Sequence, residues 1–526
     1  MSDLHFAVYS AVLFVALFLG WRSVSKHSAQ APLPPGPRLL PFVGNAFDID
    51  VSKPWLTYAN WKEKYGDLVY SRVLGQHFII ISSMKVARDL LDKRSAIYSN
   101  RPVLRAYEEF GISSTTATLS YGDTLRRHRK LYHDVLNAEA SAGYHDLFLR
   151  KAHQLVVNLL SAPEGVEDHL EMYAGSVVIA ASYGYEASSE GDPLIGCTRE
   201  AVEIVKNVMA PERATVMMAF PFLEYLPSWF PGVTYRRWAP YCKELTRRMM
   251  DEPFEIAKKT TTGAGRPSSM VANFLRENGD ISSPEEEFIK VVAISASIAG
   301  TETVRPCSRY VRQSLIILHP KTVSALHTFL LAMLLHPDVQ SRAVAEINTV
   351  CGDNIPNFEH KPSLPYIEAI CREVLRWQPV TPLGLPHATS QDDVYEGYFI
   401  PKGTLIMTAL RALSRDERLY SEAHRFDPQR HLTAEGKLND GSTFAYGFGR
   451  RICPGRHFAD LSLWAAVVSI LSTTRITKAK DSEGMDIPVI PEYTTGLAIH
   501  PKPFAYAITI INSRREEQMR VVSGME

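Results

Sequence analysis

The chain has 526 residues, with 57 Lys and Arg balanced by 57 Asp and Glu. Its net charge of zero gives no reason to expect a nucleic-acid partner. The six cysteines are scattered without a CxxC spacing, which argues against a zinc ribbon and a disulfide framework. The length exceeds that of a usual domain, yet no break in composition divides the chain. We therefore expect a single globular domain in a reducing compartment.

The N-terminus contains an uncharged apolar run from Leu4 to Trp21, close to the shortest length that spans a bilayer. Arg22 and Lys26 follow this run, so the positive-inside bias places the rest of the chain in the cytosol. We predict a transmembrane anchor over residues 1–24. A signal peptide cleaved at residues 29–31 is the alternative, but the run lacks a basic n-region and is long for such a peptide.

A proline-rich stretch follows the anchor. Pro34, Pro35 and Pro37 stiffen the chain, because proline favours extended polyproline geometry. We predict a hinge over residues 25–45 that holds the globular body at a set angle to the membrane. The remaining boundaries that we predict are a catalytic domain over residues 46–513 and a polar C-terminal tail over residues 514–526.

The start of the globular body contains the clearest strand signals. A short amphipathic helix is predicted from Trp55 to Tyr65, and strands over Leu68–Leu74 and His77–Ile81 are joined by a hairpin. Helical patterns dominate from there on, apart from two further predicted strands, Tyr395–Ile400 and Thr404–Thr408, around a Pro-Lys-Gly turn. The fold class that we predict is mainly α with a small β portion, in a single domain.

An aromatic segment interrupted by prolines extends from Ala219 to Val233. Exposed together, its apolar side chains would be a costly patch in water, so they either dip into lipid or pack into the core. These side chains are Phe220, Phe222, Leu226, Trp229 and Phe230.

Residues 288–303 predict an apolar helix of small residues that ends in Glu302 and Thr303. The pattern then breaks over residues 304–322, where prolines fall in what should be helix interior, at a cost of about 3 kcal/mol each. Without this insert, the helix would run unbroken from about Glu285 to His336. We hypothesise that the insert is retained intron sequence translated in frame. The alternative is a real loop that bulges from the helix.

Residues Phe444 to Gly455 read FAYGFGRRICPG and contain the chemistry around which the chain is organised. Cys453 lies in a turn rich in glycine and arginine, at the N-terminal side of an apolar helix. The helix dipole and its free N–H groups stabilise a thiolate there. Such a thiolate is a suitable axial ligand for haem iron. A buried, inert cysteine is the alternative.

This stretch resembles the haem-binding loop of the cytochrome P-450 family, whose pattern is Phe-x-x-Gly-x-Arg-x-Cys-x-Gly. Gly449, Arg451, Cys453 and Gly455 match the pattern, and Tyr446 stands where the family usually has Phe. The order of the other motifs along the chain is similar to that of fungal microsomal members. The resemblance implies a haem b cofactor whose iron is bound by Cys453, with Gly449 and Gly455 among the residues that bind it. Gly447 and Gly449 let the backbone turn tightly and come close to a flat cofactor, because they have no Cβ.

The resemblance also implies side chains that bind the haem propionates. These are Arg129, His387 and Arg451, while Leu125 replaces a Trp that serves this purpose in the family. One propionate bond is therefore expected to be missing. From the residues alone, a basic helix face exposed to solvent and a histidine satisfied in the core remain the ordinary interpretations.

Two further motifs match the family pattern. Ala299-Gly300-Thr301-Glu302-Thr303 corresponds to the oxygen-side motif, in which Thr303 bonds dioxygen and Glu302 relays protons through water. A solvated turn is its alternative. The second motif joins Glu373, Arg376 and Arg430 in a structural lock on the thiolate side. Its alternative is an ordinary surface pair at i,i+3 spacing. By the same resemblance, Val380, Leu383 and Leu385 project toward substrate.

The function implied is insertion of one oxygen atom of O₂ into a lipophilic small molecule. Electrons are expected from NADPH through a flavoprotein reductase, with a cytochrome b-type donor as a further candidate, and the predicted location is the endoplasmic reticulum membrane. Arg126, Arg127 and Lys130 are expected to steer an acidic redox partner. Two alternatives stay open: a haem-thiolate isomerase or dehydratase of peroxides, and an inactive haem-binding product if the insert is present.

Overall fold

The computed structural model describes residues 31–188, 192–198, 200, 225–230, 233–260, 269–279, 281–301, 321–441 and 444–525. Four predicted features lie outside this description in whole or in large part. They are the anchor over residues 1–24, the pair Glu302 and Thr303, residues 304–320 of the insert, and most of the segment 219–233.

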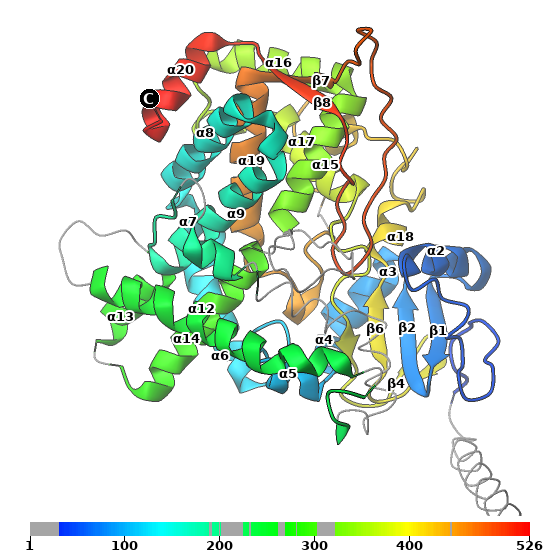
Figure 1. Cartoon of the computed structure of the whole chain (residues 1–526). Helices are drawn as coiled ribbons and strands as arrows, with labels where there is room; N and C mark the ends of the chain where they lie inside the picture. Colours follow the sequence, from blue (N-terminus) through cyan, green and yellow to red (C-terminus); the bar gives the residue numbers. More distant parts are fainter. Residues whose placement is uncertain are drawn as a thin grey trace, which may run out of the picture.

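Helices make up most of the molecule (Figure 1). The longer ones are α2 (Pro54–Tyr65), α6 (Asp123–Leu136), α8 (His145–Ser161), α9 (Val166–Tyr183), α12 (Ala239–Thr260), α13 (Met270–Asn278), α14 (Ser283–Thr301), α15 (Lys321–Leu335), α16 (Pro337–Cys351), α17 (Pro365–Trp377), α19 (Arg456–Thr473) and α20 (Ser513–Ser523). The shorter ones are α3 (Met84–Ala87), η2 (Arg88–Lys93), α4 (Ser95–Tyr98), α5 (Arg105–Glu109), α7 (Ala138–Ala142), η3 (Pro163–Gly165), η5 (Thr234–Trp238), η6 (Lys361–Ser363), α18 (Leu410–Ser414), η7 (Pro428–His431) and η8 (Gly449–Arg451).

The main core surrounds α19. This helix contacts α8, α15, α16 and α17, and the side chain of Trp464 at its middle is completely buried. In Figure 1 it passes between α8 on one side and α15 with α17 on the other. Because α19 is apolar on all sides, it is stable only when it is surrounded in this way. The helix that begins just after Cys453 is therefore held by the main core on several sides.

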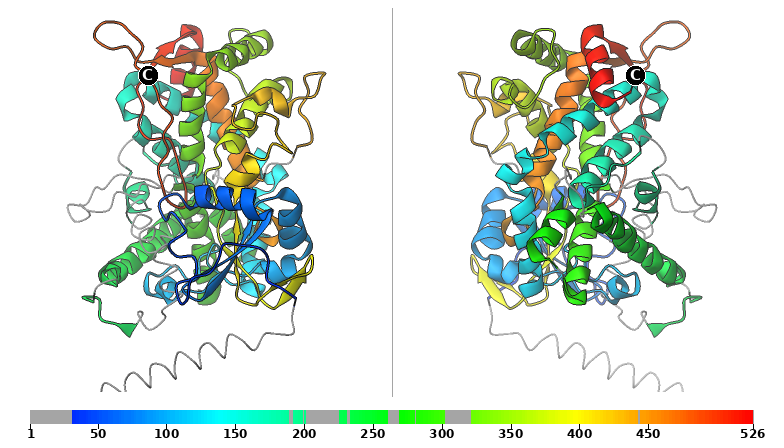
Figure 2. Two further views of the ribbon diagram at one scale, coloured as in Figure 1. Left: turned by 90° about the vertical axis from the view of Figure 1, so that its right-hand side faces the viewer. Right: turned by 90° about the vertical axis from the view of Figure 1, so that its left-hand side faces the viewer.

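The four-stranded sheet and the β4–β5 pair lie at one end of the molecule, whereas β7 and β8 lie at the other end, against the helical body (Figures 1 and 2). The four-stranded sheet has the order β1-β2-β6-β3, in which only β2 and β6 are parallel. The other strands form two hairpin-like pairs, β4 with β5 and β7 with β8. The strands are β1 (Leu68–Val73), β2 (Gln76–Ile81), β3 (His387–Ala388), β4 (Asp393–Tyr395), β5 (Tyr398–Ile400), β6 (Leu405–Thr408), β7 (Thr474–Lys478) and β8 (Tyr506–Ile510).

The predicted hairpin at the start of the body is confirmed, and the single strand predicted over Tyr395–Ile400 is wrong. Its residues belong to two antiparallel strands, β4 and β5, joined by a turn at Glu396 and Gly397. Both turn residues have positive φ, 50° and 83°. This is the geometry of a two-residue hairpin turn, which the alternation of apolar residues concealed.

The described part of the predicted hinge lies against the sheet. The carbonyl of Pro35 accepts a hydrogen bond from the N–H of Tyr70 at 2.8 Å, and that of Pro32 accepts one from Phe399 at 2.8 Å. The stretch therefore follows the edge of the globular body. Within the described residues, no single helix has the length and apolarity to cross a membrane. One sharply bent pair, α15 with α16, reaches the length and apolarity of a membrane span when the two helices are taken together.

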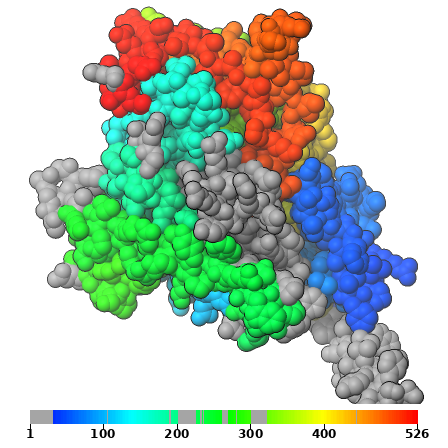
Figure 3. All heavy atoms as spheres, viewed as in Figure 1, coloured from blue at the N-terminus to red at the C-terminus, as the bar shows by residue number. Residues whose placement is uncertain are grey.

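The predicted polar tail forms helix α20. It packs on α8, as the red and cyan surfaces in Figure 3 show. Arg515 is completely buried and donates to the carbonyls of Ser472 at 2.7 Å and Asn354 at 3.1 Å. Met519 is completely buried as well. The sequence pattern concealed this docking because most of the helix is charged.

Candidate active site

A cavity lies beside the N-terminal end of α19, with Cys453 in its wall. The centre of a water molecule can move through about 280 Å³ of it, whereas a single bound water needs about 10–15 Å³ on this measure. The space therefore accepts a ligand far larger than a few waters. Its walls come from α6, α9, α14, the start of α19 and the segment before β3.

The loop that carries Cys453 is ordered by backbone hydrogen bonds. The N–H of Cys453 donates to the carbonyl of Tyr446 at 2.9 Å, and η8 forms the turn between them. Three residues later α19 begins at Arg456, so the thiol lies at the N-terminal side of a helix, as predicted. Cys453 is half-buried and lines the cavity.

Gly449 allows the cysteine loop to approach η2 closely. Its φ is +56°, and a Cβ added there would lie 1.9 Å from the carbonyl oxygen of Leu91 on η2. The glycine therefore permits contact between two parts of the protein, and that contact fixes the loop. Gly455 lines the cavity and has room for a Cβ, which would meet Leu136 at an ordinary 3.8 Å.

Three guanidinium groups line the same cavity. Arg129 donates to the carbonyl of Ile452 at 2.9 Å, which ties α6 to the cysteine loop. Arg451 donates to the carbonyls of Ser99 at 2.8 Å and Leu119 at 2.6 Å. Arg101, which the sequence analysis missed, is the third of these groups and is also buried.

The acceptors that hold Arg101 within the described residues are backbone carbonyls. It donates to the carbonyls of Ala117 at 3.1 Å and Leu385 at 2.9 Å, and also to that of Pro386. Burial lowers its pKa to about 9, and the charge of Arg451 adds to this effect. Burial and the nearby charge of Arg129 likewise lower the pKa of Arg451 to about 10. Among the lining residues that the structure describes, none is a carboxylate.

His387 lies in β3 with its ring in the cavity wall. Its Nδ1 donates to the carbonyl of Tyr98 at 2.8 Å, which fixes the tautomer. Burial, followed by the charges of Arg101 and Arg451, lowers its pKa to about 3. A negative group bound in the cavity would offset the positive charges of Arg101 and Arg451 and would therefore raise the pKa of His387.

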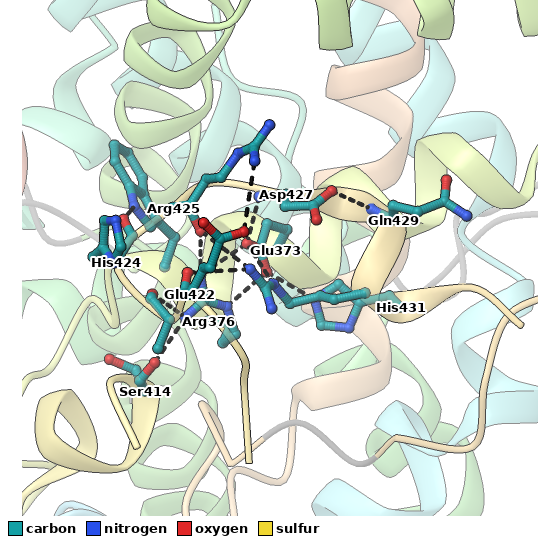
Figure 4. A network of polar contacts seen from close by, with 12 residues as sticks. Glu373, Arg376, Ser414, Glu422, His424, Arg425, Asp427, Gln429 and His431 are labelled. Atoms are coloured by element: carbon teal, nitrogen blue, oxygen red, sulfur yellow. Dashed lines mark hydrogen bonds and ion pairs between the residues drawn. The ribbon is translucent and has the colours of Figure 1, made fainter. Parts of the chain in front are cut away.

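Glu373 is the centre of a buried polar network on α17 (Figure 4). Arg376 binds it with two hydrogen bonds, Nε to Oε2 at 2.7 Å and Nη2 to Oε1 at 2.8 Å. Arg430 on η7 donates from Nε to Oε1 at 3.1 Å. The three predicted residues are therefore brought together, and the alternative of a surface pair is wrong.

His431 is a fourth member of this network that the sequence analysis missed. Its Nε2 lies 2.9 Å from Oε2 of Glu373, and the N–H of Asp427 donates to Oε1 at 2.8 Å. Burial opposes ionisation of Glu373, but the bonds from Arg376 and His431 outweigh it and lower the pKa to about 2. His431 is not part of the predicted motif, and only the folded structure shows that its ring lies beside Glu373.

Part of the cavity wall comes from α14. Ser295, Ala296 and Ala299 line the cavity there, and the N–H of Thr116 donates to Oγ of Ser295 at 3.2 Å. Leu385 also lines it, as predicted. Val380 and Leu383 are instead packed into two of the apolar cores. The backbone turn at residues 381–384 directs neighbouring side chains to different sides, which the sequence pattern did not reveal.

Residues 34–508 match the family described as Cytochrome P450, so the chain belongs to the cytochrome P450 family. It is an oxidoreductase of the monooxygenase class, as its relatives are named. Cytochrome P450 monooxygenase claR of Ampulloclitocybe clavipes is 35% identical over 93% of this chain and 88% of its own. Cytochrome P450 monooxygenase ple1 of Rhodocybe pseudopiperita is 33% identical over 99% of this chain and 97% of its own. Cytochrome P450 monooxygenase 208 of Postia placenta is 36% identical over 95% of this chain and 94% of its own.

Membership of this family implies a haem iron cofactor, and the residues of the cavity fit it. A thiol at a helix N-terminus suits the iron. Three guanidinium groups without a carboxylate among the described lining residues suit the two negative propionates of haem. The apolar remainder of the wall, from α9 and α14, suits the porphyrin and an apolar substrate.

Proposed function

We propose that the protein is a haem-thiolate monooxygenase that inserts one oxygen atom of O₂ into a lipophilic small molecule, such as a secondary metabolite or a xenobiotic. The observation that carries this proposal is the pairing, on one cavity, of the Cys453 thiol with the guanidinium groups of Arg101, Arg129 and Arg451. In this proposal the sulfur of Cys453 would bind the haem iron, and the three arginines would bind the propionates. Arg101 supplies the contact that we expected to be missing because of Leu125.

Haem, when bound, supplies the activation of dioxygen. Residues of this chain would supply the room for substrate and the exclusion of water. The small side chains of Ala296 and Ala299 leave room for substrate beside α14. The apolar wall from α9 excludes water from the reacting carbon and favours lipophilic substrates.

We further propose that Glu302 and Thr303 serve the same site. They directly follow Thr301, the last residue of α14, whose Ala296 and Ala299 line the cavity. Thr303 holds a proton by its hydroxyl, and Glu302 passes protons in from solvent. This proton supply favours a monooxygenase over an isomerase or dehydratase of peroxides, whose reactions consume no protons from outside.

The electrons are proposed to come from NADPH through a membrane-bound flavoprotein reductase, with a cytochrome b-type protein as a second donor. Exposed cations near the cysteine loop support this proposal, because they suit an acidic partner. Arg126, Arg127 and Lys130 lie on α6, and Arg450 lies in the loop itself. Such a partner would approach close to the thiolate, the shortest route for electrons.

We propose that the protein is anchored in the endoplasmic reticulum membrane by residues 1–24, with the catalytic domain in the cytosol. The apolar run Leu4–Trp21 supports this. Phe42 and Phe47 add to the support, because they lie at the end of the hinge and just after it and are 72% and 80% exposed. Trp229 of the predicted lipid-contacting segment is 68% exposed, whereas Leu226 packs against a small apolar core. Exposed aromatic side chains of this kind suit a membrane interface.

A second candidate function, an inactive haem-binding product, is favoured by the insert. α14 ends at Thr301 and α15 begins at Lys321, and the prolines of residues 304–322 fall between these helices. If the segment is retained intron sequence, the working enzyme lacks it and its two helices are continuous. Amplifying the mature transcript separates the cases. A message that encodes residues 305–321 contradicts the intron hypothesis.

The monooxygenase proposal is tested by the fate of labelled dioxygen. The protein is reconstituted in phospholipid with a flavoprotein reductase, NADPH, ¹⁸O₂ and a panel of lipophilic compounds. One oxygen atom enters the product, the other leaves as water, and one NADPH is oxidised for each product formed. Products with one ¹⁸O support the proposal. Conversion of added organic peroxides without NADPH consumption would instead identify the isomerase or dehydratase.

A further inference from the structure

One hydrogen bond joins the cysteine loop to α19. The Tyr446 hydroxyl donates to Oδ1 of Asp460 at 2.6 Å, and Asp460 lies in the second turn of that helix. The main-chain carbonyl of the same tyrosine accepts the N–H of Cys453 at 2.9 Å. Tyr446 is therefore fixed at both ends, by its side chain to α19 and by its backbone to the residue that bears the thiol.

Tyr446 occupies the position where the family pattern has Phe, so its hydroxyl is a feature of this chain. It lines the cavity, and burial, Asp460 and, after them, the electrostatic interaction with Cys453 raise its pKa. A phenol in such surroundings needs a hydrogen-bond partner. Asp460 is that partner, and a phenol bonded to a carboxylate is among the stronger contacts available to a side chain.

The groups around Asp460 come from α17, η6 and the cysteine loop. Glu368 and Arg372 face it from α17, and Lys361 faces it from η6. Lys361 and Arg372 are each engaged by Glu368, at 2.5 Å and 3.7 Å. Burial raises the pKa of Asp460 to about 6, and the bond from Tyr446 acts against this rise.

We propose that the Tyr446–Asp460 pair is a positioning contact that fixes the loop behind Cys453 and sets the reduction potential of the haem iron. The inference rests on the proposed function, in which Cys453 binds that iron. Hydrogen bonds and charges next to a ligating sulfur are among the means by which proteins tune an iron centre. The carboxylate of Asp460 is joined to the thiol-bearing residue through Tyr446, and a negative charge near the iron would stabilise its more positive oxidation state and lower its reduction potential.

Two substitutions test the pair in the full-length holoprotein. Asp460→Asn removes the negative charge and keeps the size of the side chain. Tyr446→Phe restores the family residue and removes only the hydroxyl. Tyr446→Phe leaves the carboxylate of Asp460 without its hydrogen-bond donor, so a larger fraction of Asp460 is protonated at neutral pH. We expect both variants to bind haem and to have more positive midpoint potentials than the wild type, with the larger shift for Asp460→Asn.

The double variant, with both Tyr446→Phe and Asp460→Asn, shows whether the two side chains act on the potential through one another. Its midpoint potential is expected to equal that of Asp460→Asn, because the hydroxyl acts through the carboxylate. In the reduced carbon-monoxide spectrum, the single variants are expected to lose the red-shifted thiolate band faster on standing. Tyr185 is the matched control, since it donates to Asp192 at 2.8 Å and is not among the residues that line the cavity. Tyr185→Phe should leave potential and band unchanged.

The possible outcomes are distinct. Wild-type potentials in both Tyr446→Phe and Asp460→Asn, or additive shifts in the double variant, overturn this inference and leave the proposed function intact. Lower melting temperatures at an unchanged potential also overturn it, because they indicate a purely structural contact. A wild-type protein that binds haem without the red-shifted band contradicts the proposed function and this inference together.

Discussion

The guanidinium groups of Arg101 and Arg451 line the same cavity, although 350 positions separate them in the chain. Arg101 is held by the carbonyls of residues 117, 385 and 386, and Arg451 by those of residues 99 and 119. Burial lowers the pKa of both groups, and the charge of Arg451 lowers that of Arg101 further. The protein thus concentrates positive charge that a bound dianion would stabilise.

This relationship predicts opposite effects of Arg101→Met on the protein without and with haem. The apoprotein should be as stable as the wild type or more stable, because a buried charge without a carboxylate partner is removed. Haem should dissociate at least tenfold faster, since a bond to a charged group contributes about 1.5–3 kcal/mol. The measurement is transfer of haem to an excess of apomyoglobin. Arg126→Met, at an exposed cation on α6, is the control and should behave like the wild type.

The buried network predicts a large effect of Glu373→Gln. The substitution leaves Arg376, Arg430 and His431 without the carboxylate that they share, and breaking a buried pair costs about 3–5 kcal/mol. We expect this loss in urea unfolding, with little haem-containing protein recovered.

The matched control is Glu244→Gln. Glu244 pairs with Arg247 at the same i,i+3 spacing, 2.9 Å apart, but on an exposed face of α12. Its replacement should have no measurable effect on stability. Equal losses in the free energy of unfolding for Glu373→Gln and Glu244→Gln would show that burial does not strengthen the ion pairs of Glu373.

A buried histidine predicts how stability depends on pH. His153 on α8 has a pKa lowered to about 4 by burial, and its ring nitrogens have no hydrogen-bond partner within the described part of the chain. Because the unfolded chain binds a proton more readily, the stabilising contribution of neutral His153 is complete above pH 6.5 and is lost as the pH falls toward 4. The full effect is about 3 kcal/mol.

His153→Leu should therefore flatten the pH dependence of unfolding between pH 4 and 6.5. The test is a series of urea titrations across this range. His133→Gln is the control, because His133 is exposed on α6 and should leave the slope unchanged. A wild-type slope in His153→Leu would show that another group causes the acid lability.

Local sequence signals were sufficient to predict the elements that matter most to the site. The turn before Cys453, the helix after it and the helix of small residues that ends at Thr301 all follow from glycine, proline and apolar spacing. The order of Glu373, Arg376 and Arg430 predicted their meeting because a motif records which residues interact, even when it does not give their burial.

The features that could not be predicted arise from contacts distant in sequence. Arg101 has no mark that separates it from an exposed arginine until the segment before β3 lies beside it. Tyr446 differs from the family pattern by one hydroxyl, and its partner Asp460 becomes clear only when α19 is packed. Similarly, Arg515 looks like part of a polar tail, although it is completely buried.

The central claim is that the sulfur of Cys453 binds the haem iron. The most direct measurement is the carbon-monoxide difference spectrum of the reduced wild-type protein beside that of Cys453→Ser. We predict the red-shifted band for which the family is named in the wild type and its absence in the variant, because a serine hydroxyl does not supply a thiolate. A Cys453→Ser protein that kept this band would contradict the account.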